Sequence, residues 1–254
     1  AKVELGESKL DNPYETFKDF YTKDYQRFVE YNIQDVELVD KLEDKMKLIE
    51  LCLTMAYEAK VNYTDVYSQV RCWDTIIYNH LLKKNIIIPP REDHDKDTQY
   101  EGAYVKDPQL GLHNWIVSFD LNSLYPHLIM QYNLSPETLV GVQPKNMGVE
   151  NYLNEKFNLQ WAKDKNVTVA PNGSMYRRDK QGFLPELMEK MYGDRVVFKK
   201  KTIEAKKEFQ KTKDPIYKNE ISRCNNIQMA KKIALNSAYG AIGNQYFRYF
   251  DVRI

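Results

Sequence analysis

The spacing of apolar residues predicts helices over most of the chain. One long amphipathic helix is expected over residues 36–56, because apolar side chains recur there at spacings of three and four: Val36, Val39, Leu42, Met46, Ile49, Leu53 and Ala56. Shorter helices are expected over 74–84 and 125–132. Two long helices, 184–211 and 216–241, flank a turn around Asp214-Pro215 and should form an antiparallel pair.

Two segments alternate in the manner of β-strands. In Trp115 to Leu121 five of seven residues are apolar, which predicts a strand covered on both faces, with Asp120 near its end. Ile86 to Ile88 should form a short strand that ends before Pro89. Residues 133–182 show turn signals and no clear period. The pattern as a whole predicts a multidomain α+β protein.

Composition excludes several classes of protein. No apolar run of the 254 residues approaches the length of a membrane span, and the first residues lack the apolar core of a secretory signal. Cys52, Cys72 and Cys224 form no C-x-x-C pair, so reduced thiols and a cytoplasmic location are expected. The four histidines show no zinc-ligand spacing.

Charge is distributed unevenly along the chain. The net charge is only +1, yet residues 195–232 hold twelve Lys or Arg against four Asp or Glu. A basic helical stretch is often a solubilising surface. It is equally the composition that contacts nucleic-acid phosphates, and Arg195 and Lys199 lie one helical turn apart.

The string Ser118 to Pro126 places an acid beside an aromatic ring. Tyr125 is restricted to extended or turn geometry by the proline that follows it. The backbone N–H groups of Ser123 and Leu124, at the start of a short helix, would face an anion favourably. Alternatively, Asp120 merely caps the turn before Ser123.

The string Lys232 to Gly240 carries polar groups on one helix face. Lys232, Asn236, Tyr239 and Gly240 are spaced at i, i+4, i+7 and i+8. This face is either solvated surface or, with Asp120, a site for a metal-bound nucleoside triphosphate. Farther upstream, Tyr31 and Asp35 also share a helix face, where Asp35 is either functional or a residue of a first helical turn.

These strings resemble the motifs of a known family. Residues 120–126 and 232–240 resemble the D-x-x-S-L-Y-P and K-x-x-x-N-S-x-Y-G motifs of family B DNA polymerases, most closely those of T4-like phages. Tyr31 to Asp35 resembles that family's Y-x-x-x-D exonuclease motif. Tyr100-Glu101-Gly102-Ala103 resembles its Y-x-G-G/A element, which contacts DNA through positions matching Tyr100, Gly102 and Ala103.

The resemblance implies a domain order. Residues 1–47 would end an RNase H-like 3′–5′ exonuclease domain, and 48–91 would be a returning segment of the N-terminal domain. Residues 92–181 would begin an antiparallel-sheet palm, 182–241 would form two-helix fingers, and 242–254 would continue the palm.

The resemblance also implies a DNA-directed DNA polymerase that uses two Mg²⁺ ions, with proofreading. Asp120 and the Leu121 carbonyl would bind metal in the polymerase site, and Asp35, with Tyr31 beside it, in the exonuclease site. A second palm carboxylate, expected in a D-T-D string, does not occur in this chain. Nucleotide contacts would come from residues 121–125 and from both long helices: Leu121, Asn122, Ser123, Leu124, Tyr125, Arg195, Lys199, Lys232, Asn236, Tyr239 and Gly240.

The implied partners are primer–template DNA, a deoxynucleoside triphosphate (dNTP), and a sliding clamp that would bind a segment not present here. Membrane association is not expected. By this resemblance the chain is an internal part of a polymerase and inactive by itself in both reactions. Two alternatives remain: a non-catalytic nucleic-acid-binding module, and a helical protein-interaction domain using the 36–56 stripe.

Overall fold

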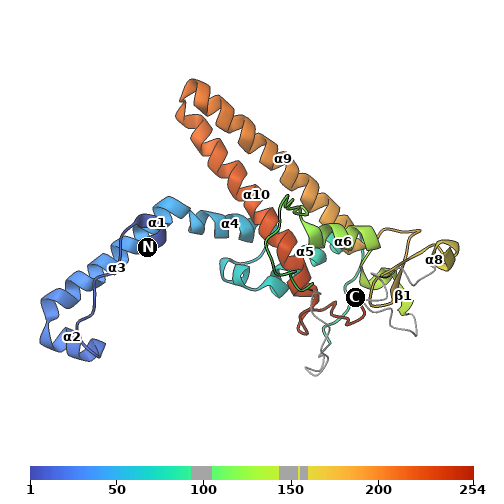
Figure 1. Cartoon of the computed structure of the whole chain (residues 1–254), viewed down its shortest axis with the longest axis horizontal. Helices are drawn as coiled ribbons and strands as arrows, with labels where there is room; N and C mark the ends of the chain where they lie inside the picture. The colour runs from blue at the N-terminus through green and yellow to red at the C-terminus, as the bar shows by residue number, and fades with distance from the viewer. Residues whose placement is uncertain (93–104, 143–153, 155–159) are drawn as a thin grey trace. The chain divides into compact units, whose positions relative to one another are not determined.

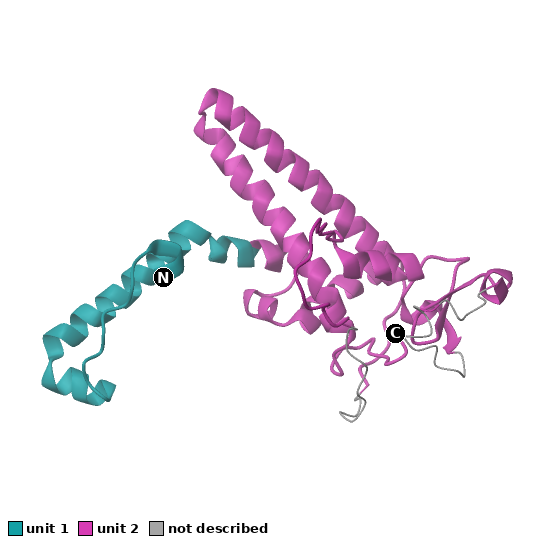
Figure 2. Ribbon diagram, in the orientation of Figure 1, with its two compact units in different colours: residues 1–53 teal, residues 54–254 magenta. Residues whose placement is uncertain are grey.

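The computed structural model describes residues 1–92, 105–142, 154 and 160–254. These residues form two compact units, 1–53 and 54–254 (Figure 2). The helices and strands follow in chain order (Figure 1): α1 Lys2–Leu5, α2 Phe17–Lys23, α3 Tyr25–Met46, α4 Leu48–Ala59, the 3₁₀ turn η1 Tyr63–Tyr67, α5 Gln69–Leu82, α6 Leu124–Tyr132, the 3₁₀ turn η2 Pro136–Thr138, β1 Leu139–Val142, α8 Gln160–Asp164, β2 Val167–Val169, β3 Ser174–Arg177, α9 Phe183–Thr212 and α10 Pro215–Ile242.

The first unit is built on α2 and α3. Each helix has a side-chain N-cap, since the Thr16 hydroxyl accepts from the Asp19 N–H at 3.0 Å and the Asp24 carboxylate from the Arg27 N–H at 3.3 Å. Phe20 is fully buried, and aromatic rings surround it: Tyr14, Phe28 and Tyr31. An aromatic cluster therefore holds this unit together.

The prediction of a single helix over 36–56 is wrong, because the helix is interrupted at Lys47 and residues on either side belong to α3 and α4. This residue adopts a left-handed conformation with φ of 52°, and its N–H donates to the Glu43 carbonyl at 2.8 Å. The Glu43 carboxylate then accepts from the Leu48 N–H at 3.0 Å and the Ile49 N–H at 3.1 Å, which starts α4. Val36 and Val39 are mostly exposed, whereas Leu38 is buried.

The second unit has a helical core. Figure 1 shows α9 and α10 side by side as an antiparallel pair, which confirms the predicted pair of long helices. Lys213 adopts a left-handed conformation and ends α9, and the Asp214 carboxylate caps the start of α10. Helices α5 and α6 pack against the first turns of α9 and the last turns of α10. Their presence confirms the helices expected over 74–84 and 125–132. The core is formed by side chains from all four helices: Trp73, Ile77, Leu81, Ile129, Leu184, Leu187, Met188 and Leu235.

A small sheet lies within residues 139–177, where the sequence pattern predicted no regular secondary structure. Its three strands are antiparallel in the order β1-β3-β2. Thr168 and Leu139 both pair with Tyr176, which is fully buried. Strands of three or four residues are too short to show a period, so only the pairing reveals them.

The predicted strand over 115–121 is wrong in this structure. Residues 105–122 form no strand, and Trp115 and Phe119 are 99% and 89% exposed. Trp115 has φ of 59°, which a pleated strand does not accommodate. A strand also needs a hydrogen-bonded neighbour, and no described strand pairs with this segment. Residues 86–88 likewise form no strand.

Two glycines, Gly182 at the N-cap of α9 and Gly193 inside that helix, predict opposite effects of substitution on stability. A Cβ at Gly182 would lie 2.5 Å from the Cβ of buried Ser135, whereas a Cβ at Gly193 would meet nothing within 4 Å. Gly182→Ala should therefore cost about 1–3 kcal/mol of unfolding free energy through overpacking. Gly193→Ala should add roughly 0.5–1 kcal/mol, because alanine is preferred inside a helix. Urea unfolding of both variants checks this, and equal shifts would contradict the packing.

Candidate functional site

The tertiary structure brings the two motif strings into contact. The ring of Tyr125, in the first turn of α6, stacks on the ring of Tyr239 in α10, with centroids 4.6 Å apart and an interplanar angle of 12°. Both side chains remain nearly half exposed. The stack is therefore an open aromatic platform to which both strings contribute, and this contact could not be read from the sequence.

The guanidinium of Arg195, in α9, contacts the residue at the N-terminus of α6. Arg195 Nη1 donates to the Ser123 hydroxyl at 3.1 Å, so α9 is joined to the residue that begins α6. Its Nε is buried and has no hydrogen-bond partner among the described residues. Ser123 itself has φ of 52° and serves as the N-cap position of α6 without a side-chain cap. A guanidinium with an unused donor thus lies beside a helix N-terminus, an arrangement suited to an anion.

One face of α10 is exposed as the spacing predicted. Lys232, Asn236, Tyr239 and Gly240 are exposed, whereas Leu235 and Ala238 are buried. Lys199 of α9 is also exposed. Gly240 has a second constraint, since a Cβ there would lie 2.9 Å from Gln69 Oε1. Gln69 Oε1 is the end of a flexible side chain, so a Cβ at residue 240 would have to displace that side chain.

Asp120, Leu121 and Asn122 lie in the exposed segment before α6. The structure does not place the Asp120 carboxylate at the end of a buried strand, so that geometric basis of the prediction is wrong. The residue is nevertheless only three positions from Ser123, which contacts Arg195. No cluster of three or more His, Cys, Asp or Glu suited to a metal occurs among the described residues.

Tyr31 and Asp35 belong to the first unit. Both lie well inside α3, which begins at Tyr25, so Asp35 is not in a first helical turn and the dipole-partner interpretation is wrong. Lys9 donates to Asp35 Oδ2 at 2.9 Å, and this bond raises the pKa of Lys9. Asp35 Oδ1 is buried and has no hydrogen-bond partner within the described part of the chain. Tyr100, Gly102 and Ala103 lie outside the described residues.

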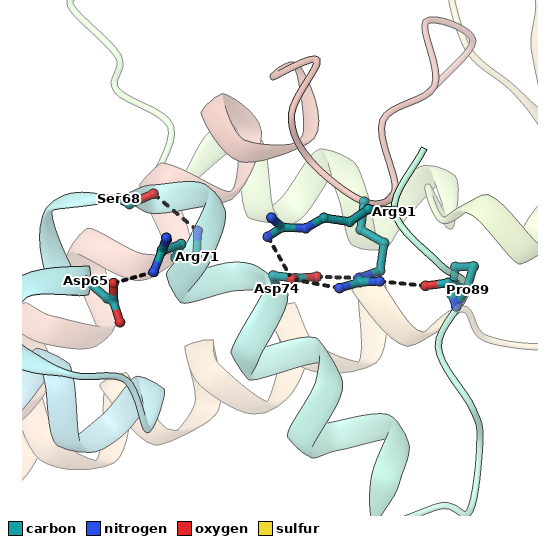
Figure 3. Close-up of polar contacts among 7 residues, drawn as sticks. Asp65, Ser68, Arg71, Asp74, Pro89 and Arg91 are labelled. Atoms are coloured by element: carbon teal, nitrogen blue, oxygen red, sulfur yellow. Dashed lines mark hydrogen bonds and ion pairs between the residues drawn. The ribbon is translucent and has the colours of Figure 1, made fainter. Parts of the chain in front are cut away.

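A carboxylate in α5 ties three parts of the second unit together. Asp74 binds Arg248 through two contacts, Nε to Oδ1 at 2.8 Å and Nη2 to Oδ2 at 3.2 Å, and Arg91 at 3.2 Å (Figure 3). Arg248 also donates to the Pro89 carbonyl at 2.7 Å. The hydrogen bonds that Arg248 donates to the Asp74 carboxylate raise the pKa of Arg248. This clamp joins residues 89–91 and the chain after α10 to one helix, and no sequence spacing indicated it.

The sequence pattern also did not indicate that one lysine of α10 is buried. Lys231 is only 8% exposed, although the next residue, Lys232, is exposed. Its ammonium lies 2.7 Å from Glu58 Oε2 and 3.3 Å from Asp194 Oδ2. The available signal was its position on the apolar stripe of α10, four residues before Leu235.

Comparison with known proteins identifies the family. A family model described as DNA polymerase family B matches residues 60–252. The chain is 29% identical to the DNA-directed DNA polymerase of Escherichia phage RB69 and 31% identical to that of Enterobacteria phage T4. Each match covers 99% of this chain and 32% of the relative. The chain thus spans about a third of the length of these curated relatives.

A solved structure agrees with the fold. The family B DNA polymerase of the archaeon Pyrobaculum calidifontis superposes with a TM-score of 0.63 at 21% identity, over 96% of this chain and 29% of that one. The chain belongs to DNA polymerase family B, which confirms the resemblance read from the motifs. Among the described residues no helix is long and apolar enough to cross a membrane.

Proposed function

We propose that this chain supplies part of the active site for template-directed DNA synthesis. In this proposal α9 and α10 are the fingers, α6 with the segment before it belongs to the palm, and a dNTP binds between them. The single observation that carries the proposal is the Tyr125–Tyr239 stack, which joins the two motif strings. The Arg195–Ser123 hydrogen bond adds a cation of α9 to the same place.

The polar and aromatic groups around that contact suit the parts of a dNTP. Lys232 and Lys199 supply ammonium groups, and Arg195 supplies a guanidinium, all of which bind phosphate oxygens. The ring platform offers a flat apolar surface for the sugar and base. Tyr125 would lie under the deoxyribose, where a 2′-hydroxyl would meet its ring. The other exposed lysines of α9 would contact primer–template phosphates.

The carboxylate of Asp120 fits Mg²⁺ as part of a metal–triphosphate complex. Mg²⁺ is commonly held by one or two carboxylates together with substrate phosphates and water, so a dedicated cluster of protein ligands is not required. Asp120 and the Leu121 carbonyl would be the ligands from this chain. When bound, the metal neutralises charge that develops during phosphoryl transfer.

The protein's own residues position the reactants. Phosphoryl transfer requires alignment of the attacking and leaving oxygens and cations near the transferred group, rather than covalent help from the protein. Arg195 and Lys232 would hold the triphosphate from the helical side, while Asp120 holds its metal from the other. The ring platform would fix the sugar and thereby the α-phosphate.

Binding of a dNTP to this chain tests the proposal directly. Isothermal titration calorimetry should show binding that needs Mg²⁺ and is lost on addition of EDTA. The corresponding ribonucleotide should bind more weakly because of the Tyr125 ring. A non-catalytic nucleic-acid-binding module would bind DNA with no need for Mg²⁺ or dNTP, and a helical interaction domain would bind neither. Either result would contradict the proposal.

We also propose that Asp35 serves a proofreading 3′–5′ exonuclease site, with Tyr31 beside it. The support is its buried Oδ1, which no described residue meets with a hydrogen bond, and the Lys9 ammonium, which already occupies a cation position at Oδ2. In a full-length polymerase carrying this segment, Asp35→Ala should abolish degradation of a primer 3′ end and leave primer extension intact. Gel analysis of a labelled primer measures both, with Asp40→Ala as a control on an exposed acid of the same helix. Persistent degradation would mean that Asp35 has only a structural role.

A further inference from the structure

The buried ammonium of Lys231 joins three helices at one level of the second unit. It contacts Glu58 of α4 at 2.7 Å and Asp194 of α9 at 3.3 Å from its own position in α10. The lysine side chain is 10% exposed, whereas those of Glu58 and Asp194 are 33% and 45% exposed. The cation is therefore the buried member of the group, and its two partners approach it from different helices.

The positions of the partners connect this group to the candidate site. Asp194 directly precedes Arg195, and Lys231 directly precedes Lys232. Neighbouring residues of a helix are separated by about 100° around its axis and by about 1.5 Å along it. The Lys231–Asp194 contact therefore restrains both the rotation and the offset of α9 against α10 at the level of the two proposed phosphate-binding cations.

Polar contacts add directional restraints to the packing of this part of α10, where Leu235 and Ala238 are buried. A pocket of about 370 Å³ lies on the same side of α10, lined by residues of α4, η1, α5, α9 and α10, with Glu58, Lys231 and Ser237 among them. In its wall, Trp73 Nε1 donates to the Ala234 carbonyl at 3.1 Å and to the Ser237 hydroxyl at 3.2 Å. Beside this pocket, directional hydrogen bonds and ion pairs help to set the orientation of the helix, together with the buried side chains of its core face.

We infer that Lys231 is a positioning residue, which through Glu58 and Asp194 holds α9 and α10 in the rotation that presents Arg195 and Lys232 to a triphosphate. The inference rests on the proposed function. A buried ion pair adds little net stability, since desolvation offsets its attraction, yet it favours one geometry over its neighbours. The group therefore acts on the geometry of the site more than on the folded state as a whole.

The test compares three variants of the chain. Lys231→Met removes the charge at similar volume, Asp194→Asn removes its contact with α9, and Lys231→Arg restores a cation able to meet both carboxylates. Titration of Mg–dNTP should show a dissociation constant raised roughly 5- to 20-fold in the first two, less than the loss of a full charge-assisted contact. Lys231→Arg should lie within about threefold of the parent chain. Lys200→Met, on an exposed position of α9, is the control for charge.

A second measurement does not depend on nucleotide. The indole N–H of Trp73 gives a nuclear magnetic resonance signal, assigned by its loss in Trp73→Phe, that reports the contact with Ala234 and Ser237. This signal should shift in Lys231→Met and Asp194→Asn and return in Lys231→Arg. An unmoved signal, or an unchanged dissociation constant, would overturn the inference. If the parent chain binds no dNTP, the proposed function fails, while the Trp73 signal still decides whether Lys231 orients α10.

Discussion

Asp120→Asn should remove most of the Mg²⁺-dependent affinity of the chain for a dNTP. The substitution keeps the size of the side chain and removes its charge, so the metal loses its carboxylate ligand from this chain. Loss of one member of a charge pair in such a site costs about 2 kcal/mol at the low end, or about 30-fold in the dissociation constant. Because residue 120 is exposed, stability should stay within about 0.5 kcal/mol. Calorimetric titration with and without Mg²⁺ measures the effect.

The matched control for this experiment is Asp107→Asn. Asp107 is an exposed acid of the same segment, thirteen residues earlier, and it belongs to neither motif. Its replacement changes the net charge equally and should leave the titration unaltered. If both variants bind Mg–dNTP as tightly as the parent chain, Asp120 is not a metal ligand.

Lys232→Ala should weaken dNTP binding by the value of a charge-assisted hydrogen bond. That value is roughly 1.5–3 kcal/mol, or about 10- to 150-fold in the dissociation constant. The exposed ammonium of Lys232 lies on the same helix face as Tyr239, which stacks on Tyr125. A dNTP seated on the rings would therefore place its phosphates within reach of α10. The loss should persist at raised salt, since a direct contact is screened less than a long-range attraction.

Lys206→Ala provides the comparison for Lys232→Ala. Lys206 is an exposed lysine of α9, eleven residues beyond Arg195. Its removal should change dNTP affinity only at low salt, through the general field of the basic helices. Equal effects of the two substitutions at all salt concentrations would show that Lys232 acts by charge alone and makes no specific contact.

The helices of the second unit were predictable because their signals are local. The stripe through Trp73, Ile77 and Leu81 gives the period of a helix, and the turn at Asp214-Pro215 separates two long helices. The position at which a helix is interrupted is harder to predict from the sequence. Lys47 is not a residue type that signals a left-handed cap, so the end of α3 depends on Glu43 capping the next helix.

The strands were not predictable, for a different physical reason. A strand is stabilised by hydrogen bonds to a neighbour, so its apolar alternation shows what it could bury and not whether a neighbour is present. Trp115 to Leu121 alternates well and forms no strand among the described residues, whereas β1, β2 and β3 alternate too briefly to detect and do pair. Pairing is a property of distant residues.

The sequence by itself determined the family, the long helices, and the side chains that α10 exposes, because motif spacing and helical period are both read along one segment. Only the tertiary structure decided that Tyr125 meets Tyr239, that Arg195 reaches Ser123, and that Lys231 is buried between two acids. Each of these contacts joins residues at least 37 positions apart in the chain. Such contacts depend on how helices pack and not on any local preference of the residues that make them.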